Sequence, residues 1–370
     1  MKQGDMHAQD LRFMRLAIAL GQRGLGRVWP NPAVGCVVVQ DGRIVGRGWT
    51  APGGRPHAEP QALAQAGAAA RGATVYVSLE PCAHHGKTPP CARALIDAGV
   101  ARVVTALTDP DPRVAGGGHA MLRAAGISVT EGVMAQAARV ANAGFLMRVE
   151  QGRPWLTLKL ALTLDGRIAT AQGESRWITG PQARRAVHAM RARHDAVLVG
   201  AGTARADDPD LRVRDLGTEW QPLRLVADPR LSLPSDSRLG RSAAAPPVWM
   251  LHGASAPLPA RRAWGATGAG LIEVAASSTG QLDPAAMLQA LGARGLTRVL
   301  CEGGGLLAAS LLRAGLVDEL VVFSAGKVLG AEARPGIGPL GLNRLADAPG
   351  FALAELRTVG PDVLQIWRRG

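Results

Sequence analysis

The fold of the N-terminal half is decided by residues 56–91, which read PHAEPQALAQAGAAARGATVYVSLEPCAHHGKTPPC. In this stretch His57 stands before a helical segment, Cys82 follows an apolar strand-like run, and Cys91 opens a second helical segment. One imidazole and two thiolates hold zinc tetrahedrally and leave the fourth position open for water. The sequence therefore predicts one zinc ion per chain, bound by His57, Cys82 and Cys91.

Glu59 is expected to be the catalytic residue of this site, because it lies two residues after His57 and is not needed as a ligand. Zinc lowers the pKa of a water molecule to about 7, so hydroxide is available to attack an amidine-like ring carbon. A free carboxylate can take the proton of that water and hand it to the departing amine. A His-x-Glu pair followed by Pro-Cys and a further cysteine is typical of zinc-dependent base deaminases.

The other two cysteines are expected to pack in hydrophobic cores. Cys36 lies within a valine-rich strand, and Cys301 ends another strand. Taken singly, His57 would be a surface or capping histidine, and Cys82 or Cys91 a small buried hydrophobe. Their order along the chain, together with Glu59, favours the metal site over these separate structural roles.

Helix and strand patterns alternate around the motif. Apolar residues at helical spacing predict an opening helix from Leu11 to Gly21. Strands over 34–39 and 44–48 are joined by Asp41-Gly42, a dipeptide suited to a hairpin turn. We further expect helices over 60–70 and 91–98, strands over 73–79 and 102–106, a loop over 109–114, and a helix and a strand within 119–130. This alternation predicts a layered α/β fold.

A domain boundary is expected where a helical stretch ends near Val149 and Gln151-Gly152-Arg153-Pro154 follows. A chain of 370 residues exceeds the usual size of one core, so we predict two domains, 1–150 and 151–370. In the second domain we expect strands over 155–162, 196–199, 223–227, 248–251, 299–301 and 319–323, and helices over 182–193 and 306–314. The Ala, Pro and Gly rich stretch from Ser242 to Gly270 is expected to form surface connections.

The formal net charge of +13 fits either a nucleic-acid surface or an enzyme that handles phosphorylated substrates. The chain has one Tyr and four Phe and lacks a basic and aromatic alternation, which argues against a nucleic-acid partner. It also lacks an apolar run long enough to cross a membrane and a small-residue cleavage site after its first apolar segment. We therefore expect a cytoplasmic enzyme that acts on a small molecule and contacts no membrane.

The spacing of the cysteines makes a family resemblance specific. Eight residues separate Cys82 from Cys91, and the segment 82–91, together with PNPAVGC at 30–36, resembles the bifunctional deaminase/reductases of riboflavin biosynthesis. The resemblance implies a cytidine-deaminase-like first domain, a mixed sheet with helices on both faces. It also implies that Asn31, His84 and Lys87 belong to the pocket that binds a phosphoribosylaminopyrimidine.

The second half carries a glycine-rich turn, Glu302-Gly303-Gly304-Gly305, between a strand and a helix, which alone is weak evidence for a phosphate cradle. The segments 158–167, 175–179 and 206–209 resemble the reductase motifs of the same family, whose fold is similar to dihydrofolate reductase. The resemblance implies NADPH contacts from Ala161, Trp177, Thr203, Asp207, Gly304, Gly305, Leu306, Leu307, Ala308, Ala309 and Ser310. It implies substrate contacts from Ser175, Arg191, Leu211, Arg214 and Glu302.

The function that these motifs predict is zinc-dependent deamination of a phosphoribosylaminopyrimidine, followed by NADPH reduction of its ribosyl group. One alternative is an RNA or nucleobase deaminase with a fused accessory domain, which the long segment between the cysteines and the few aromatic residues disfavour. Another is a deaminase-like binding module without activity, disfavoured because all three ligands and Glu59 are present. The sequence leaves the oligomeric state open, including a homo-oligomer.

Overall fold

The computed structural model describes residues 3–84, 89–112, 114–277 and 279–370. The chain divides into two compact units, Met1–Gly152 and Arg153–Gly370. The boundary expected from the sequence, between residues 150 and 151, falls close to this division. Among the helices of the described ranges, none is both long enough and apolar enough to span a membrane.

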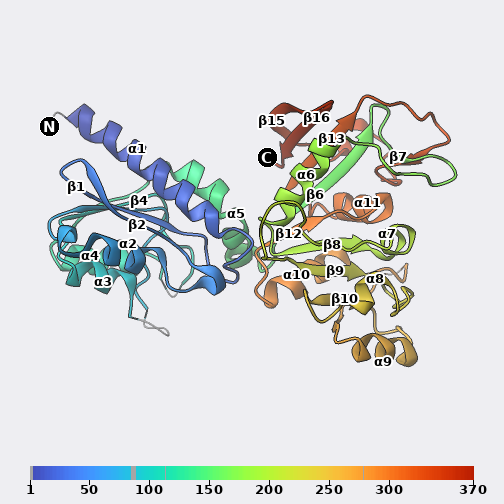
Figure 1. Ribbon diagram of the computed structural model, residues 1–370, viewed down its shortest axis with the longest axis horizontal. Coiled ribbons are helices and arrows are strands. Elements are labelled where there is room, and N and C mark those ends of the chain that lie inside the picture. Colours follow the sequence, from blue (N-terminus) through green and yellow to red (C-terminus); the bar gives the residue numbers. More distant parts are fainter. Residues whose placement is uncertain (1–2, 85–88, 113, 278) are drawn as a thin grey trace. The chain divides into compact units, whose positions relative to one another are not determined.

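The first unit is built on a five-stranded sheet of mixed direction (Figure 1). Its strands follow the order β2 (Arg43–Trp49), β1 (Gly35–Gln40), β3 (Thr74–Val77), β4 (Arg102–Thr105) and β5 (Ser128–Thr130). β1 pairs antiparallel with both neighbours, whereas β3, β4 and β5 run parallel. The helices α1 (Gln3–Gly21) and α5 (Ala135–Gln151) cover one face, and α2 (Ala58–Ala66), α3 (Cys91–Asp97) and α4 (Gly117–Ala124) the other. The predicted mixed sheet with helices on both faces is confirmed.

Local sequence explains how the hairpin and α2 meet. Asp41 and Gly42 have φ angles of 49° and 74°, the positive values that a tight hairpin turn requires. On β2, a Cβ added to Gly48 would lie 2.2 Å from the carbonyl oxygen of Ala58. Because glycine has no side chain there, the first turn of α2 rests directly on the sheet, which fixes the start of the helix next to His57.

The second unit is built on a nine-stranded sheet. Its order is β11 (Gly270–Glu273), β10 (Val248–His252), β9 (Leu223–Ala227), β8 (Ala196–Gly200), β12 (Arg298–Cys301), β6 (Trp155–Thr163), β13 (Glu319–Ala325), β16 (Asp362–Arg368) and β15 (Ala352–Val359). The strands from β11 to β13 are parallel, and β16 and β15 add an antiparallel edge. A small separate sheet pairs β7 (Arg167–Ala169) with β14 (Arg334–Pro335).

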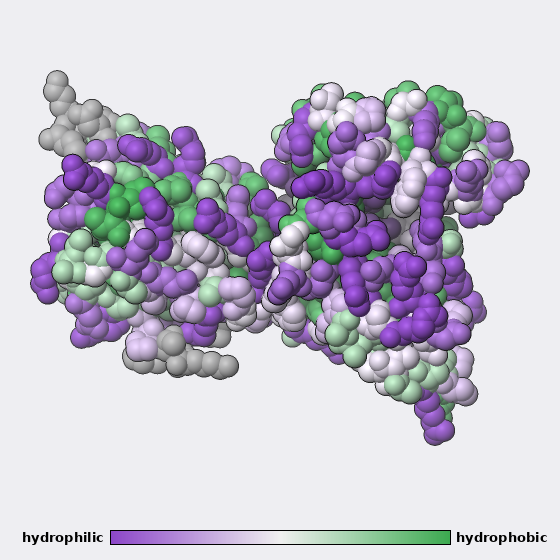
Figure 2. All heavy atoms as spheres, viewed as in Figure 1, coloured by the Kyte–Doolittle hydropathy of each residue, from purple (hydrophilic) through white to green (hydrophobic). Residues whose placement is uncertain are grey.

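The helices of the second unit follow the strands of its sheet. They are α6 (Pro181–Arg191), α7 (Ala201–Asp207), α8 (Arg238–Arg241), α9 (Leu258–Ala266), α10 (Pro284–Ala293) and α11 (Gly305–Arg313). Short 3-10 turns lie at Gln22–Gly24, Pro52–Gly54 and Gly67–Ala70 in the first unit and at Leu345–Asp347 in the second. Hydrophilic side chains cover much of the visible face of this unit, with smaller apolar areas between them (Figure 2).

The expectation that Ser242 to Gly270 forms only surface connections is wrong. Besides β10, which the sequence predicts, this stretch contains α9, and the side chain of Trp264 in α9 is buried. Its indole Nε1 donates a hydrogen bond to the carbonyl oxygen of Leu233 at 2.9 Å. One aromatic anchor thus docks a helix whose composition otherwise resembles a loop.

The sheet edge formed by β15 and β16 was also not predicted. The residues of β15 that precede Val359 are all exposed. A strand with no buried face has no alternation of apolar and polar residues by which the sequence could identify it.

Candidate active sites

The three predicted zinc ligands converge in the first unit. Nδ1 of His57 lies 3.3 Å from Sγ of Cys91 and 3.7 Å from Sγ of Cys82. The ligand atoms of all three residues lie within 4.8 Å of one another. Bond lengths of about 2.0–2.3 Å in a tetrahedral zinc site place ligand atoms roughly 3.5–3.8 Å apart, so the arrangement fits a zinc ion.

Two of the three ligands lie at the starts of helices, and the third lies in the segment after β3. His57 is the N-cap residue of α2, and Cys91 is the first residue of α3. Cys82 follows β3, and its Sγ accepts the backbone N–H of Cys91 at 3.3 Å. Backbone amides at a helix N-terminus favour negative charge, so the start of α3 stabilises the Cys82 thiolate.

The ionisation of the two cysteines differs in the absence of a metal. Hydrogen bonds from Cys91 and His57 lower the pKa of Cys82 to about 4. The neighbouring Cys82 sulfur and burial raise the pKa of Cys91, because two adjacent thiolates repel each other in a buried site. The hydrogen bond with Cys82 also raises the pKa of His57. A bound cation would favour the ionised form of both thiols and the neutral imidazole.

Glu59 lies beside the cluster in the first turn of α2, and it is 3% exposed. Burial, and then the negative charge of Cys82, raise the pKa of its carboxyl group. A carboxyl group with a raised pKa exchanges a proton more readily near neutral pH. Burial and geometry therefore suit Glu59 to carry a proton rather than to bind the metal.

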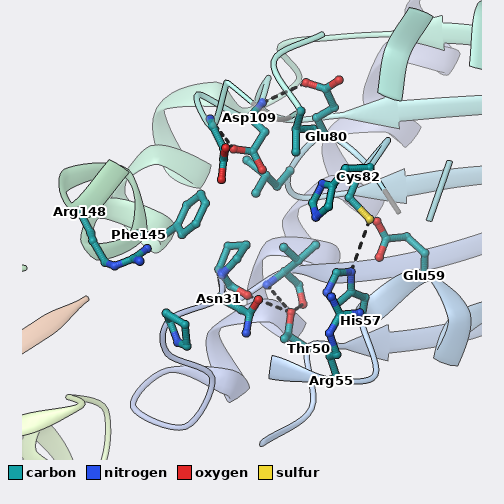
Figure 3. Close-up of a pocket in the computed structure, with 17 residues that line it drawn as sticks. Asn31, Thr50, Arg55, His57, Glu59, Glu80, Cys82, Asp109, Phe145 and Arg148 are labelled. Carbon is teal, nitrogen blue, oxygen red and sulfur yellow. Dashed lines mark hydrogen bonds between the residues drawn. The ribbon is translucent and has the colours of Figure 1, made fainter. Parts of the chain in front are cut away.

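A cavity of about 280 Å³ opens next to these residues (Figure 3). Asn31 and His84 line it, together with His57, Glu59 and Cys82. Nδ1 of His84 is buried and has no hydrogen-bond partner among the residues that the structure describes. Lys87, which the family resemblance also implies, lies outside the described residues.

The sequence did not identify several residues that line the same cavity. These are Arg55, Glu80, Asp109, Asp111, Phe145 and Arg148, which come from separate segments of the first unit. The two Asp-Pro steps at 109–112 predicted a loop but gave no indication that it forms a wall of the pocket. These residues are far apart in the sequence, so no short spacing predicts that they line one cavity.

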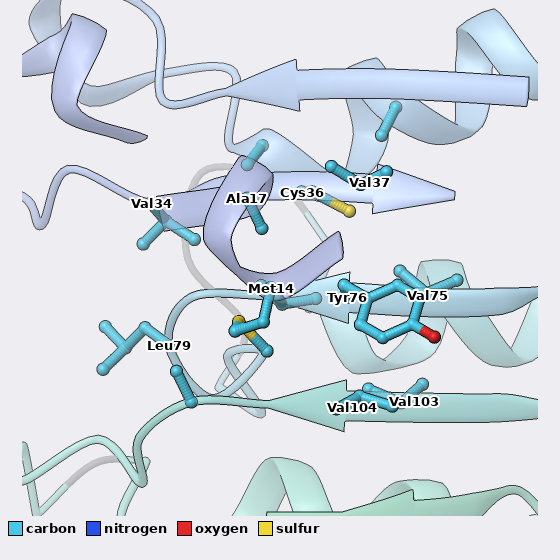
Figure 4. Packing of buried hydrophobic residues seen from close by; sticks show 14 of the residues in the cluster. Met14, Ala17, Val34, Cys36, Val37, Val75, Tyr76, Leu79, Val103 and Val104 are labelled. Carbon is cyan, nitrogen blue, oxygen red and sulfur yellow. The ribbon is translucent and has the colours of Figure 1, made fainter. Parts of the chain in front are cut away.

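The two cysteines outside the metal cluster are buried, as predicted. Cys36 packs in the core of the first unit among side chains that include Met14, Ala17 and Val37 (Figure 4). Cys301 is likewise fully buried at the end of β12. Burial raises the pKa of both thiols, so each stays protonated and apolar in character.

In the second unit the predicted reductase residues gather where parallel strands end. β8, β12 and β6 are adjacent and parallel, so their carboxyl ends lie at one edge of the sheet. Thr203 follows β8, Glu302 and Gly304 follow β12, and Ala161 lies near the end of β6. Ligands of α/β sheets bind at such an edge.

Arg191 and Glu302 form a bidentate ion pair at this edge. Nε and Nη2 of Arg191 donate to the two carboxylate oxygens of Glu302 at 2.6 Å and 3.0 Å. Burial alone would raise the pKa of Glu302, but the charge of Arg191 outweighs it and lowers the pKa to about 2. Nη1 of Arg191 donates to the carbonyl oxygen of Arg212 at 2.9 Å.

A side chain of α7, the helix that follows β8, ties down the glycine turn. Gly304 is the N-cap residue of α11, and its N–H donates to Oγ1 of Thr203 at 2.8 Å. A Cβ added to Gly305 would lie 2.9 Å from the carbonyl oxygen of Pro335, so only glycine allows this approach. Leu306, which follows, is 80% exposed.

Lys159 belongs to the same cluster, although its role was not identified from the sequence. It lies on β6 two residues before Ala161, and alternate residues of a strand face the same side. Burial lowers the pKa of Lys159, while the charges of Glu302 and Asp207 oppose that shift. Burial also raises the pKa of Asp207. The edge therefore carries both basic and acidic groups.

The remaining residues predicted for the reductase site differ in their exposure and in their contacts. Trp177 is 60% exposed, its ring stacks under Arg184 at 4.4 Å, and its carbonyl oxygen accepts a hydrogen bond from Lys327 at 2.6 Å. The backbone N–H of Arg214 donates to Nδ1 of His188 at 3.3 Å. Leu211 is buried in an apolar cluster, so only its backbone is available to a ligand. Ser175 is partly exposed.

Two family models match the chain. The model described as the RibD C-terminal domain matches residues 154–365, and that of the cytidine and deoxycytidylate deaminase zinc-binding region matches residues 7–107. The riboflavin biosynthesis protein RibD of Escherichia coli strain K12 is 45% identical to the chain and covers 96% of it and 98% of its own length. That of Aquifex aeolicus is 38% identical, with 97% of this chain and 98% of the relative covered.

Solved structures also match nearly the whole chain. RibD of Acinetobacter baumannii has a TM-score of 0.87 and 38% identity, covering 99% of this chain and all (100%) of that one. A second solved structure is that of a diaminohydroxyphosphoribosylaminopyrimidine deaminase/5-amino-6-(5-phosphoribosylamino)uracil reductase of Thermotoga maritima. It has a TM-score of 0.84 and 34% identity, and the match covers 99% of this chain and 100% of that one.

Proposed function

The chain belongs to the RibD family, and on this premise we propose that its first unit deaminates a diaminopyrimidinone carrying a phosphoribosylamino group and its second reduces the product with NADPH. It is a bifunctional enzyme of riboflavin biosynthesis, with a deaminase zinc-binding region and a RibD C-terminal domain. We propose that the deaminase domain spans residues 1–150 and the reductase domain residues 151–370. The observation that carries the proposal is the meeting of His57, Cys82 and Cys91 around a point beside the unligated Glu59.

In the deaminase, His57, Cys82 and Cys91 would hold the zinc ion, which when bound acts as a Lewis acid and makes a nucleophile of water available at neutral pH. Glu59 then accepts a proton and delivers it to the leaving amine of the ring. The raised pKa of Glu59 supports this role, because the carboxyl group can hold the proton between the two events.

Asn31, His84 and Lys87 are proposed to bind the pyrimidine and its phosphoribosyl group. Asn31 and His84 line the cavity that also exposes the metal ligands. The buried Nδ1 of His84 would gain a hydrogen-bond partner from the substrate, which favours binding because an unpaired buried polar atom is costly. Lys87 would supply positive charge for the phosphate.

In the reductase, NADPH is proposed to lie along Ala161, Trp177, Thr203, Asp207 and residues 304–310. The N-terminus of α11 at Gly305 offers backbone amides to phosphate groups of the cofactor. Trp177 exposes a large aromatic surface that a bound cofactor would cover. Hydride would pass from NADPH to the first carbon of the open-chain ribosylimine.

Ser175, Arg191, Leu211, Arg214 and Glu302 are proposed to bind the substrate of the reductase. Of the five N–H groups of Arg191, the described residues engage three, so two remain for a phosphate. Glu302 fixes the orientation of the guanidinium, and the backbone of Leu211 is the part available to the ligand. Lys159 adds a positive charge next to this group.

We further propose that the enzyme acts in the cytoplasm on this small molecule, without a nucleic-acid or membrane partner, and that it can form homo-oligomers. The few aromatic residues support a small-molecule substrate over RNA, since single-strand binders use aromatic side chains to stack on bases. The net charge of +13 suits a substrate and a cofactor that are both phosphorylated.

The experiment that tests the proposal follows both steps in one sample. Zinc-loaded full-length chain is mixed with the phosphoribosylaminopyrimidine and either NADPH or NADH, and ammonia and the oxidised nucleotide are measured. We expect equal amounts of ammonia and oxidised NADPH, and a slower reaction with NADH. Ammonia release without nucleotide oxidation would contradict the proposed reductase activity. The absence of both products would contradict the whole proposal.

A further inference from the structure

Glu80 is a second buried glutamate beside the metal cluster, and four backbone amides engage its carboxylate. Oε1 accepts the N–H of Gly118 at 2.8 Å and that of His119 at 3.2 Å. Oε2 accepts the N–H of Gly116 at 3.0 Å and that of Asp109 at 3.1 Å. The side chain is 0% exposed. A carboxylate enclosed in this way has its acceptor sites filled, so it is not placed to exchange protons with a substrate as Glu59 is.

The four amides come from the two ends of one segment. Asp109 lies in the loop that follows β4, whereas Gly116, Gly118 and His119 lie at the start of α4. The N-cap residue of α4 is Gly116, which has no side chain to pair with the free amides of the first turn. Glu80 therefore caps α4 from a distant part of the chain and also binds Asp109 in the loop after β4.

The loop closed by Glu80 forms one wall of the deaminase cavity. Asp109, Asp111 and Val114 line the cavity, and Figure 3 shows Asp109 next to Glu80. Glu80 also stands two residues before Cys82 in the chain. One carboxylate thus connects the segment that carries a metal ligand to the wall that faces the substrate.

The packing around Gly118 leaves this connection little freedom. A Cβ added to Gly118 would lie 1.9 Å from the carbonyl oxygen of Pro81 and 3.2 Å from Cγ of Glu80. The start of α4 therefore rests directly on the backbone between Glu80 and Cys82. Without the carboxylate, the four amides would be unpaired in a buried site, and the loop would have to move to reach other acceptors.

We propose that Glu80 is a positioning residue of the deaminase, which holds the cavity wall that carries Asp109, Asp111 and Val114 at a fixed place relative to Cys82. The inference rests on the proposed deaminase activity of the first unit. Because the carboxylate is hydrogen-bonded to backbone amides rather than to the metal ligands, its loss should leave zinc bound and displace the wall. A displacement of about 1 Å in an active site can cost up to about 100-fold in rate.

The test compares Glu80→Ala and Glu80→Gln with the control Glu131→Gln in the full-length chain. Glu131 pairs with the side chains of His119 and Arg123 in α4 and accepts a hydrogen bond from Thr108, so its variant removes a carboxylate next to the same helix but leaves the four amides with their acceptor. We expect Glu80→Ala to lower kcat/KM for deamination by about 10- to 100-fold, with zinc content and reductase rate unchanged. Formate should restore much of the loss, since it can enter the vacated space and accept the same amides.

Glu80→Gln keeps the volume of the side chain and tests the same contacts if the alanine variant does not fold. It should also lose activity, because its NH₂ group faces amide donors, and formate should not rescue it. Hydrogen exchange of the amides of Asp109, Gly116, Gly118 and His119 gives a readout apart from catalysis. It should quicken in Glu80→Ala and slow again with formate.

Unchanged exchange of these amides in Glu80→Ala would overturn the inference. Two further results with Glu80→Ala would also overturn it: deamination within twofold of the parent chain, or a loss of activity that formate does not reverse while zinc stays bound. An absence of ammonia release by the parent chain would instead contradict the proposed function, so the two failures are distinguishable.

Discussion

Nδ1 of His57 lies 3.3 Å from Sγ of Cys91, although the two residues are 34 positions apart in the sequence. The contact joins the N-cap of α2 to the first residue of α3, and Cys82 completes the group. Two thiols and an imidazole held this close form a site that a soft or borderline divalent cation stabilises. The deaminase half of the proposed function depends on this cluster.

Replacing a thiol ligand should remove zinc and deamination together. Cys91→Ser leaves a hydroxyl group that does not ionise at neutral pH, so we expect zinc to fall from about one per chain to near zero. Ammonia release should cease, while NADPH oxidation with the deaminated substrate persists. Metal analysis and both assays on Cys91→Ser and on the control Cys36→Ala check this. Zinc retention in Cys91→Ser would contradict the ligand assignment.

The glycine turn of the reductase should need its side-chain acceptor. Thr203→Val keeps the shape of the side chain but leaves the N–H of Gly304 without its partner at 2.8 Å. An unpaired buried donor costs about 1–3 kcal/mol, and this donor is partly buried, so we expect the KM for NADPH to rise by about tenfold. Steady-state kinetics should show no such change for Thr218→Val, where Oγ1 accepts the N–H of Trp220 in a loop. An unaltered KM in Thr203→Val would argue against a cofactor at this turn.

The Arg191 and Glu302 pair should make stability depend on pH. The pKa of Glu302 is lowered to about 2 from its ordinary value of 4.5, so the carboxylate adds stability above pH 4.5. That contribution decreases as the pH falls from 4.5 towards 2. Glu302→Gln removes one partner of a buried pair and should cost about 3–5 kcal/mol at pH 7.

Urea unfolding of the reductase unit at pH 7, 5, 4 and 3 measures this dependence. The difference between the parent and Glu302→Gln should shrink below pH 4.5. The control Glu355→Gln breaks an exposed pair with Arg357, 2.7 Å apart, and should cost less than about 1 kcal/mol. A difference that stays constant from pH 7 to pH 3 would contradict the assigned ion pair.

Lys159 should matter for reduction and not for deamination. Lys159→Met keeps the length of the side chain and removes a charge that lies among Glu302, Arg191 and Asp207. Preorganised charges in an enclosed site contribute about 100-fold or more to rate, so we expect a loss of that order in reductase kcat/KM. Deamination by the same chain serves as the control for folding. Reduction at the parental rate would exclude Lys159 from the site.

The sequence predicted the elements whose signal is local. The hairpin turn follows from the dipeptide Asp41-Gly42, whose two residues have positive φ angles. The helix before Gly21 and the role of the cysteines as metal ligands follow from short spacings in the sequence. Contacts made by distant segments were not predictable in this way. Glu80 accepts amides as far as 39 residues away, and its position before Pro81 gives no sign of them.

Two features of the second unit were not predicted from the sequence, for similar reasons. Lys159 reads as an ordinary polar position in a strand, and only the parallel pairing of β6 with β12 places it near Glu302. Trp264 anchors α9 within a stretch whose composition resembles a loop. In both cases the decisive contact depends on the order of strands or on a single buried side chain, which hydrophobic periodicity does not record.

Glu59→Gln in the full-length, zinc-loaded chain tests the central claim most directly, because it separates the two reactions. With the phosphoribosylaminopyrimidine as substrate, we expect neither ammonia nor NADPH oxidation, while zinc content stays at the parental value. With the deaminated uracil compound supplied instead, NADPH oxidation should proceed at the parental rate. Normal ammonia release by Glu59→Gln would contradict the account.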